Sequence, residues 1–443
     1  MRGAAVGAAL AALLVAAASP AGAAGPTEVD GRVSLRAVFS ADAPNNPATF
    51  LSFLETDARA RGLTASDLRL VLDATFILDV TETNERRFGE TERLDQIRSL
   101  YAEQPGIAGR LDLRVGRRII PEAGNAWVDG VDAQLWLDPD RASVGLYGGL
   151  APDPFDRAFT TTFQAAGLYG TLHRPGFTAS AAYNTVLRDT ALDRQFVFNR
   201  LHWKVAEGLF LASYLVVDFV DVPEVTTLLG TVDYTPVRPL NLTLTVSRYS
   251  IEQYRDQTVY RNIIEPNQAL LLGNEVVDLV YNRVRASGTL RVARSLFHYQ
   301  SVEYKQRSQD GREAWLYTIG LREEDLLDLG LRADLQGQVA NEFQSDTALV
   351  ALDLRRDFGS KVTLGGRLGW FDGRTVGRAT ERGRAFDEAQ RILLVGASLA
   401  WRATAAHHLD LIYDGVGETE LQDQRNGQNL FIHTAMARYS WLY

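Results

Sequence analysis

Arginine and aspartate recur at alternate positions in several short segments, and their spacing is the first sign of possible chemistry. Residues two apart in a β-strand face the same side. Opposite charges on one face form ion pairs, whereas arginines without such partners attract anions. Sets of both signs occur at Arg110/Asp112/Arg114, at Arg332/Asp334 and at Asp353/Arg355.

A second set consists of arginines alone. Arg283, Arg285 and Arg291 share a face if their segment is a strand, and no acidic residue stands two positions from any of them. We predict that they form a basic stripe that favours anionic solutes. The alternative interpretation is a lattice of cross-strand salt bridges.

No pattern in the sequence predicts catalysis or a bound metal ion. The motifs G-x-S-x-G and H-E-x-x-H are absent, as is a phosphate-binding loop. His407 and His408 are adjacent, so in a strand they would point to opposite faces and could not hold one ion together. We therefore predict no enzyme activity, no metal and no cofactor.

The elements that position these charges are predicted to be strands. Apolar residues alternate with polar or charged ones in the segments 68–80, 110–119, 329–339, 348–355 and 362–370. We count about 22 such segments, within a range of about 18 to 24. The segment 91–103 fits either a strand or a helix.

The connections alternate in length. Tight turns are expected at 173–176, 205–208, 236–239, 292–295, 357–360 and 404–406, and longer polar connections at 251–274, 373–388 and 417–427. Short turns at one rim and longer loops at the other are typical of outer-membrane barrels, whose short turns lie in the periplasm. A soluble β-sandwich gives no reason for this segregation.

Composition excludes several classes of protein. The net charge of −9 argues against nucleic-acid binding, which needs a basic face. After the first residues there is no run of about 18 apolar residues, the length of a transmembrane helix. The chain has no cysteine, which excludes disulfides and a lipoprotein anchor.

The N-terminal residues have the pattern of a secretory signal peptide. Met1 and Arg2 precede an uncharged stretch that ends in the small residues Ala21, Gly22 and Ala23. We predict a cleaved signal peptide over 1–23, a short N-terminal segment over 24–30, and a single barrel domain over 31–443.

The C-terminal residues place aromatic rings at every second position. Tyr439, Trp441 and Tyr443 share one face of a strand. This ending resembles the last strand of bacterial outer-membrane β-barrels, which is the signal for the barrel-assembly machinery. The resemblance implies periplasmic chaperones and that machinery as partners.

A second resemblance lies in the segment 111–118, Leu-Asp-Leu-Arg-Val-Gly-Arg-Arg, followed by Asp129-Gly130-Val131. It is similar to the "V-G-R-Q", loop and "D-G-V" pattern of porin-like barrels, except that Arg118 stands in place of Gln. The chain thus resembles porin-like bacterial outer-membrane barrels. The fold expected is all-β, a transmembrane antiparallel up-and-down barrel with both termini periplasmic.

In such a barrel the apolar faces meet lipid and the charged faces line the interior. Arg117 interrupts an apolar face and is expected near a rim, because lipid-facing arginine at the midplane costs about 2 to 4 kcal/mol. The candidates for the interior are the charged residues of the segments above: Arg110, Asp112, Arg114, Arg118, Arg283, Arg285, Arg291, Arg332, Asp334, Asp353, Arg355 and Arg367.

The function implied is passive diffusion of small hydrophilic solutes across the bacterial outer membrane, with a mild preference for anions. Alternatives are a non-conducting barrel that houses a partner, a soluble exported β-protein and a barrel enzyme. A wide barrel would be leaky, so we expect the loop 251–274 or the loop 373–388 to fold inward. The sequence does not indicate an oligomeric state.

Overall fold

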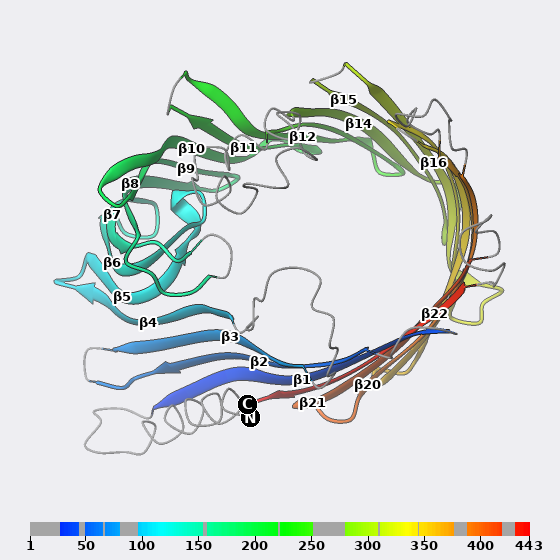
Figure 1. Cartoon of the computed structure of the whole chain (residues 1–443), viewed down its shortest axis with the longest axis horizontal. Helices are drawn as coiled ribbons and strands as arrows, with labels where there is room; N and C mark the ends of the chain where they lie inside the picture. Colours follow the sequence, from blue (N-terminus) through cyan, green and yellow to red (C-terminus); the bar gives the residue numbers. More distant parts are fainter. Residues whose placement is uncertain are drawn as a thin grey trace, which may run out of the picture.

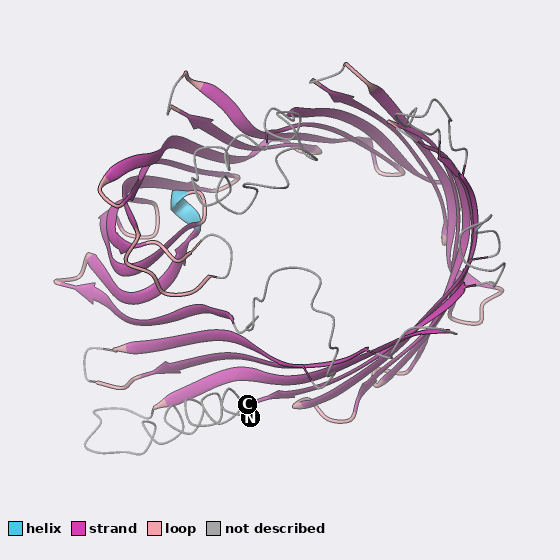
Figure 2. Cartoon of the chain, viewed as in Figure 1, coloured by secondary structure: helices cyan, strands magenta, loops and turns pink. Residues whose placement is uncertain are grey.

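The computed structural model describes residues 27–43, 49–64, 67–79, 96–153, 157–219, 222–250, 280–308, 311–343, 345–375, 388–418 and 430–443. Strands dominate these residues, and a 3-10 helix, η1 (Pro121–Ala123), is the single helical element among them (Figure 2). The strands are β1 (Glu28–Ala43), β2 (Thr49–Arg61), β3 (Arg69–Asp79), β4 (Gln96–Ile107), β5 (Leu111–Ile120), β6 (Ala126–Asp138), β7 (Ala142–Leu150), β8 (Phe163–Arg174), β9 (Phe177–Arg188), β10 (Ala191–Ala206), β11 (Leu209–Asp218), β12 (Glu224–Val237), β13 (Leu240–Ser250), β14 (Val280–Arg291), β15 (Leu296–Arg307), β16 (Glu313–Leu326), β17 (Leu331–Glu342), β18 (Ser345–Phe358), β19 (Val362–Thr375), β20 (Glu388–Arg402), β21 (His407–Glu418) and β22 (Leu430–Leu442).

The strands form one closed sheet. Each strand pairs antiparallel with the next strand of the chain, and β1 also pairs with β22. Figure 1 shows the resulting ring almost end-on, with β1 beside the last strands. A closed sheet leaves no unpaired edge. The expected antiparallel up-and-down barrel of 22 strands is therefore confirmed.

The seam between β1 and β22 joins the two ends of the barrel domain. The hydroxyl groups of Ser34 and Ser440 share a buried hydrogen bond of 2.8 Å. At the end of the seam, the Gly31 amide donates to the Tyr443 carbonyl (3.0 Å), and the Tyr443 amide donates to the Gly31 carbonyl (3.1 Å). The terminal residue is thus part of the closure.

The two rims of the barrel carry different connections. Each even-numbered strand joins the next strand at one rim, for example through Pro175–Gly176 and Glu207–Gly208, and β1 begins and β22 ends there. The opposite rim carries the longer connections, including 251–279 and 376–387. This segregation agrees with the sequence-based expectation.

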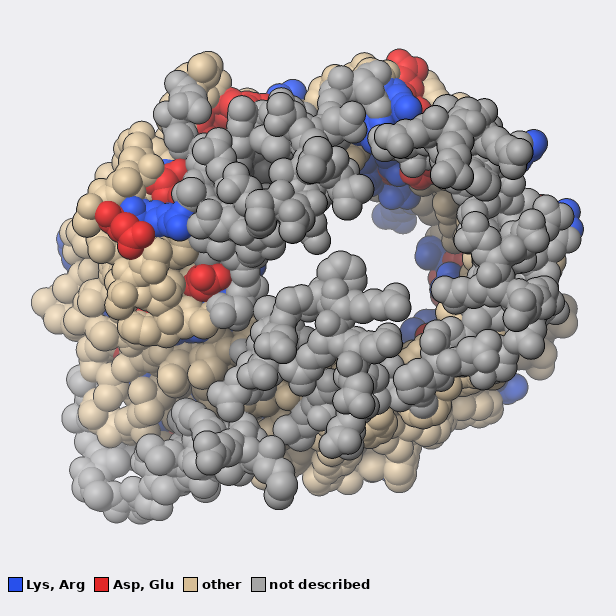
Figure 3. Space-filling model, viewed as in Figure 1, with Lys and Arg blue, Asp and Glu red and all other residues tan. Residues whose placement is uncertain are grey.

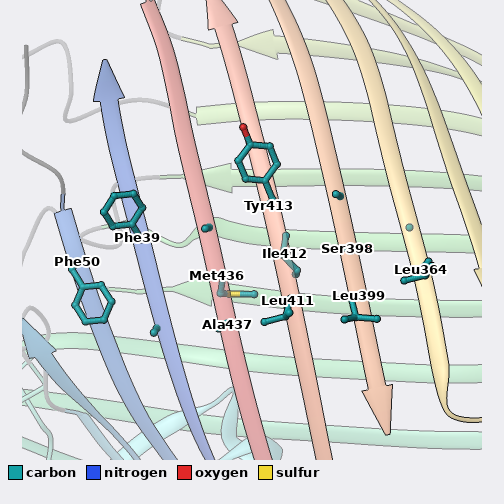
Figure 4. Close-up of a pocket in the computed structure, with 14 residues that line it drawn as sticks. Phe39, Phe50, Leu364, Ser398, Leu399, Leu411, Ile412, Tyr413, Met436 and Ala437 are labelled. Carbon is teal, nitrogen blue, oxygen red and sulfur yellow. The ribbon is translucent and has the colours of Figure 1, made fainter. Parts of the chain in front are cut away.

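Apolar side chains cover the outer face of the barrel. Paired residues of an antiparallel sheet share a face, and Leu146 lies opposite Leu168 on this one. Their exposed fractions are 64% and 60%, and that of Val339 is also 60%. A soluble protein rarely exposes large apolar side chains so contiguously. Figure 4 shows part of this surface, an apolar hollow whose lining residues come from β1, β2 and β19–β22.

Exposed aromatic rings lie near both rims of the outer face. The rim with short turns carries Trp203, Tyr234, Trp401, Tyr439, Trp441 and Tyr443. Near the opposite rim are Phe39, Phe50, Trp315 and Trp370. Two aromatic belts that flank an apolar band are a property of membrane-spanning barrels.

The strands β5–β11 curl around a hydrophobic core of their own, at the left of Figure 1. We call these strands, with η1, the lobe. η1 lies inside the curl, where a Cβ on Gly124 would lie 2.9 Å from the Phe198 side chain. The core residues are Ile120, Ala123, Val128, Tyr147, Ala165, Tyr169, Ala182, Phe196, Phe198 and Val216.

The structure tests some of the expectations from the sequence, and others concern residues that it does not describe. The helical alternative for 91–103 is wrong from Gln96 onward, because β4 begins there and pairs with β3 and β5. The signal peptide over 1–23, the whole of the loop 251–274 and residues 376–387 of the loop 373–388 lie outside the described residues. Within the described residues, no helix is long and apolar enough to cross a membrane.

Deleting Tyr443 should destabilise the closed barrel by about 2 kcal/mol, because two backbone hydrogen bonds at about 1 kcal/mol each are lost. The folded fraction after refolding, measured by heat-modifiable mobility on a gel, should fall. Tyr443→Phe keeps both bonds and serves as the control. Equal refolding of the deletion and wild type would show that the seam does not need this residue.

Candidate functional site

The inner face of the barrel carries most of the charged residues that the sequence singled out. Arg114 and Arg118 lie inside the lobe, and their side chains are only 11% exposed. On the opposite wall, the side chains of Arg332, Arg355 and Arg367 are 48%, 58% and 52% exposed. The same residue type therefore occurs in two settings, one packed and one open.

The packed setting is built around Asp132 of β6, which is 2% exposed. Arg114 donates to it from β5 (3.2 Å) and to Glu103 of β4 (2.7 Å). Arg118 of β5 also pairs with Asp132. A buried carboxylate is costly unless paired and hydrogen-bonded, and here two guanidinium groups neutralise it.

Tyrosines extend this network across intervening strands. The Tyr169 hydroxyl of β8 donates to Asp132 of β6 (2.7 Å), so the side chain crosses β7. It can do so because Gly145 of β7 has no side chain, and a Cβ there would overlap the Tyr169 ring. The bridge ties strands that are second neighbours and holds the tight curl of the lobe.

The same arrangement occurs twice more. Tyr147 of β7 crosses Gly167 of β8 and donates to Asn184 of β9 (2.7 Å). On the opposite wall, formed by β14–β19 and called the open wall below, Tyr299 of β15 crosses Gly320 of β16 and donates to Asp334 of β17 (2.6 Å). Glycine at the crossed position is thus a packing requirement.

The open wall over β14–β19 has exposed cations with partners on neighbouring strands or turns. Arg283 pairs with Glu303 (3.1 Å), and Arg367 pairs with Asp353 (3.2 Å). Arg332 pairs with Glu324 (3.3 Å). In Figure 3, Lys and Arg side chains gather along this wall, beside an aperture through the molecule.

The sequence predicted ion pairs between residues two apart. The structure shows one of them, between Arg114 and Asp112 (3.5 Å), and corrects the pairs Arg332/Asp334 and Asp353/Arg355. Asp334 accepts from Tyr299 rather than pairing with Arg332, and Asp353 pairs with Arg367 of β19. Directly opposed residues of neighbouring strands have Cβ atoms about 4.5–5.5 Å apart, closer than same-face residues along one strand, which are about 6.6 Å apart. Arg355 does contact an acid two positions away, Asp357 (3.8 Å).

The three arginines of the expected basic stripe have different roles. Arg283 is paired with Glu303, whose side chain is 5% exposed. Arg285 donates to the Ser301 hydroxyl (3.4 Å). Arg291 turns to the carbonyl oxygens of Ala293 (3.3 Å) and Arg294 (3.0 Å from Nε), and so holds the β14–β15 turn.

Three other charged residues lie at the ends of strands or in a turn. Arg110 is exposed in the turn between β4 and β5, and not within a strand. Asp112 accepts from the Trp136 indole (2.9 Å) at the same end of β5. Arg117 faces outward near the opposite end of β5, where Asp129 neutralises it (2.6 Å).

Sequence reasoning missed the tyrosine bridges, Glu103 and the aromatic core residue Phe198. A tyrosine that faces inward and lies two strands away from an acidic residue indicates such a bridge only when the register of the strands is known. The sequence does not specify which glycine lies under which ring, so these residues could not be found by motif.

The described residues contain no cluster of three or more His, Asp or Glu side chains that could hold a metal ion. His407 faces outward, where its Nδ1 lies 2.7 Å from the Tyr439 hydroxyl. His408 is on the opposite face, opposite Ser440. The two rings therefore point apart.

No family model matches the sequence, and no curated protein matches it. The chain is similar to a number of solved structures, including the following three. OccK11 (OpdR) of Pseudomonas aeruginosa is 12% identical, with a TM-score of 0.44 over 94% of this chain and 95% of that one. OpdO of the same species is 13% identical, with a TM-score of 0.42 over 94% and 97% of the two chains. OccAB2 of Acinetobacter baumannii is 10% identical, with a TM-score of 0.41 over 94% and 98%. At such low values these likenesses indicate neither a family nor a solute.

Replacing Tyr169 by Phe should lower the free energy of unfolding by about 1.5–3 kcal/mol, the usual contribution of a hydrogen bond to a charged group. Urea unfolding in lipid vesicles, followed by tryptophan fluorescence, measures the change. Tyr317→Phe is the matched control, because Tyr317 is 51% exposed on the outer face. Equal losses in both variants would contradict a specific role for the Tyr169–Asp132 bridge.

Proposed function

We propose that this chain is a porin-like channel of the bacterial outer membrane through which small hydrophilic solutes diffuse passively. One observation carries the proposal: apolar side chains cover the outside of a closed barrel and charged side chains line its inside. A soluble β-protein has the opposite arrangement, with its apolar faces in a core.

The membrane half of the proposal rests on the outer face. Lipid offers no hydrogen bonds, so a sheet can cross it only as a closed barrel. The exposed apolar band lies between the two aromatic belts described above, as lipid contact requires. The partners proposed on this basis are outer-membrane lipid and, for delivery, periplasmic chaperones and the barrel-assembly machinery.

The ends of the chain complete this proposal. We infer that residues 1–23 are a cleaved signal peptide and that Tyr439, Trp441 and Tyr443 are the assembly signal. The three rings are exposed on the outer face at the rim of short turns. Short turns lie in the periplasm in such barrels, which puts both ends of the barrel domain there.

The channel half rests on the inner face. Exposed guanidinium and carboxylate groups along β14–β19 favour water and hydrated solutes over apolar ligands. Nearly all of the cations described there have an acidic partner, so any charge preference is weak. Arg285 contacts a hydroxyl group, and its charge gives the wall a slight preference for anions. No catalytic role is part of the proposal.

Single-channel recording in a planar bilayer tests the proposal. Refolded protein should give stable open steps, and in asymmetric salt the reversal potential should show a slight preference for anions. Protein that inserts without current would contradict the channel and favour a barrel that houses a partner. Protein that never inserts would contradict the membrane location.

Arg285→Gln should lower the anion-to-cation permeability ratio by about fourfold at low salt. A unit charge about 10 Å from an ion in water contributes about 0.4 kcal/mol, a factor of about two, and it acts in opposite directions on the anion and on the cation. The control is Arg356→Gln, because Arg356 lies on the outer face opposite Leu364. A reversal potential unchanged by Arg285→Gln would remove Arg285 from the selectivity of the wall.

A further inference from the structure

We propose that the lobe is a fixed partition inside the barrel, which leaves solutes only the lumen enclosed by the other strands. The inference rests on the proposed channel function and specifies the size class of the solutes that pass. Seven strands, β5–β11, supply the lobe core, so fifteen of the 22 strands remain to surround the opening.

This number of strands matters because pore width grows with strand number. Barrels of about 16–18 strands leave an aqueous channel, whereas 22-stranded outer-membrane transporters are plugged. In the described part of this chain, the residues packed into the barrel come from its own wall and from η1. The lobe thus narrows a wide barrel to nearly the size of a porin.

The lobe is built to stay closed. Asp132, at 2% exposure, is held by Arg114, Arg118 and the Tyr169 hydroxyl. Opening the curl would separate Asp132 from Tyr169 of β8, and removing a partner from a buried charge is strongly destabilising. Phe198, at 0% exposure, packs edge-to-face on Tyr214 with ring centroids 5.0 Å apart. A gate would need an opening transition with a lower free-energy cost.

An opening is visible along the wall that faces the lobe. In the space-filling view, Lys and Arg side chains of this wall flank an aperture through the molecule (Figure 3). Solutes would therefore pass between the lobe surface and the wall β14–β19. Small hydrophilic molecules fit this size class.

Cysteine labelling tests the closed lobe, since the natural chain has no cysteine. Ala182→Cys places a thiol in the lobe core, at a position 5% exposed. Ser287→Cys places one on the inner face of β14, opposite Ser301. A small, membrane-impermeant maleimide should label the first on the order of 100-fold more slowly, because it must wait for local opening.

Full unfolding in urea should make the two thiols equally reactive, which is the control for chemistry at each position. Equal labelling of the folded variants would overturn the partition. This outcome is independent of conductance, so a silent protein with a protected Ala182→Cys thiol would refute the channel and keep the closed lobe.

Polymer exclusion from the open channel tests the size class. Polyethylene glycols of increasing radius should stop reducing the current at the radius found for an open barrel of about 16–18 strands measured alongside. Entry of distinctly larger polymers would overturn the partition. Phe198→Ala, which opens a cavity in the lobe core, should raise the cut-off, whereas Leu168→Ala on the outer face should leave it unchanged.

Discussion

Closure of the backbone hydrogen-bond ladder is the constraint on which the rest of this structure depends. Each strand pairs with both neighbours around the ring, and the seam is completed by the bonds between Gly31 and Tyr443. Because side chains alternate along every strand, closure sorts them into one outer and one inner surface. The alternating sequence then places apolar residues on the outer surface and charged residues on the inner one.

The shape of the ring depends on glycine and tyrosine together. A uniform ring would hold its strands at similar curvature, yet β5–β11 curl around their own core. Tyr169 and Tyr147 can reach second-neighbour strands only because Gly145 and Gly167 lie beneath their rings. The Tyr299–Asp334 bridge on the open wall shows that one bridge alone does not produce a lobe.

Alternation in the sequence was enough to predict the barrel and the number of strands. Period two is a local property, so it can be counted without knowing which strands meet. Partners are different, because register is a long-range property. The sequence predicted that Asp334 pairs with Arg332, whereas in the structure Asp334 accepts a hydrogen bond from Tyr299. It grouped Arg291 with Arg285, although Arg291 holds a turn. The lobe lay beyond prediction for the same reason, since its core joins residues of seven strands.

Arginine occurs in a packed setting in the lobe and in an exposed setting on the open wall, and similar sequence patterns therefore have different roles. In the lobe, Arg114 and Arg118 are 11% exposed, so their attraction to Asp132 is little screened, and removing either leaves this buried carboxylate with one cationic partner fewer. On the open wall, Arg332 and Arg355 are about half exposed, and water screens their pairs until each contributes little stability. A pair that contributes little to folding is free to act on passing ions. In the proposed channel, the wall that faces passing ions is thus the one whose charges the fold does not need.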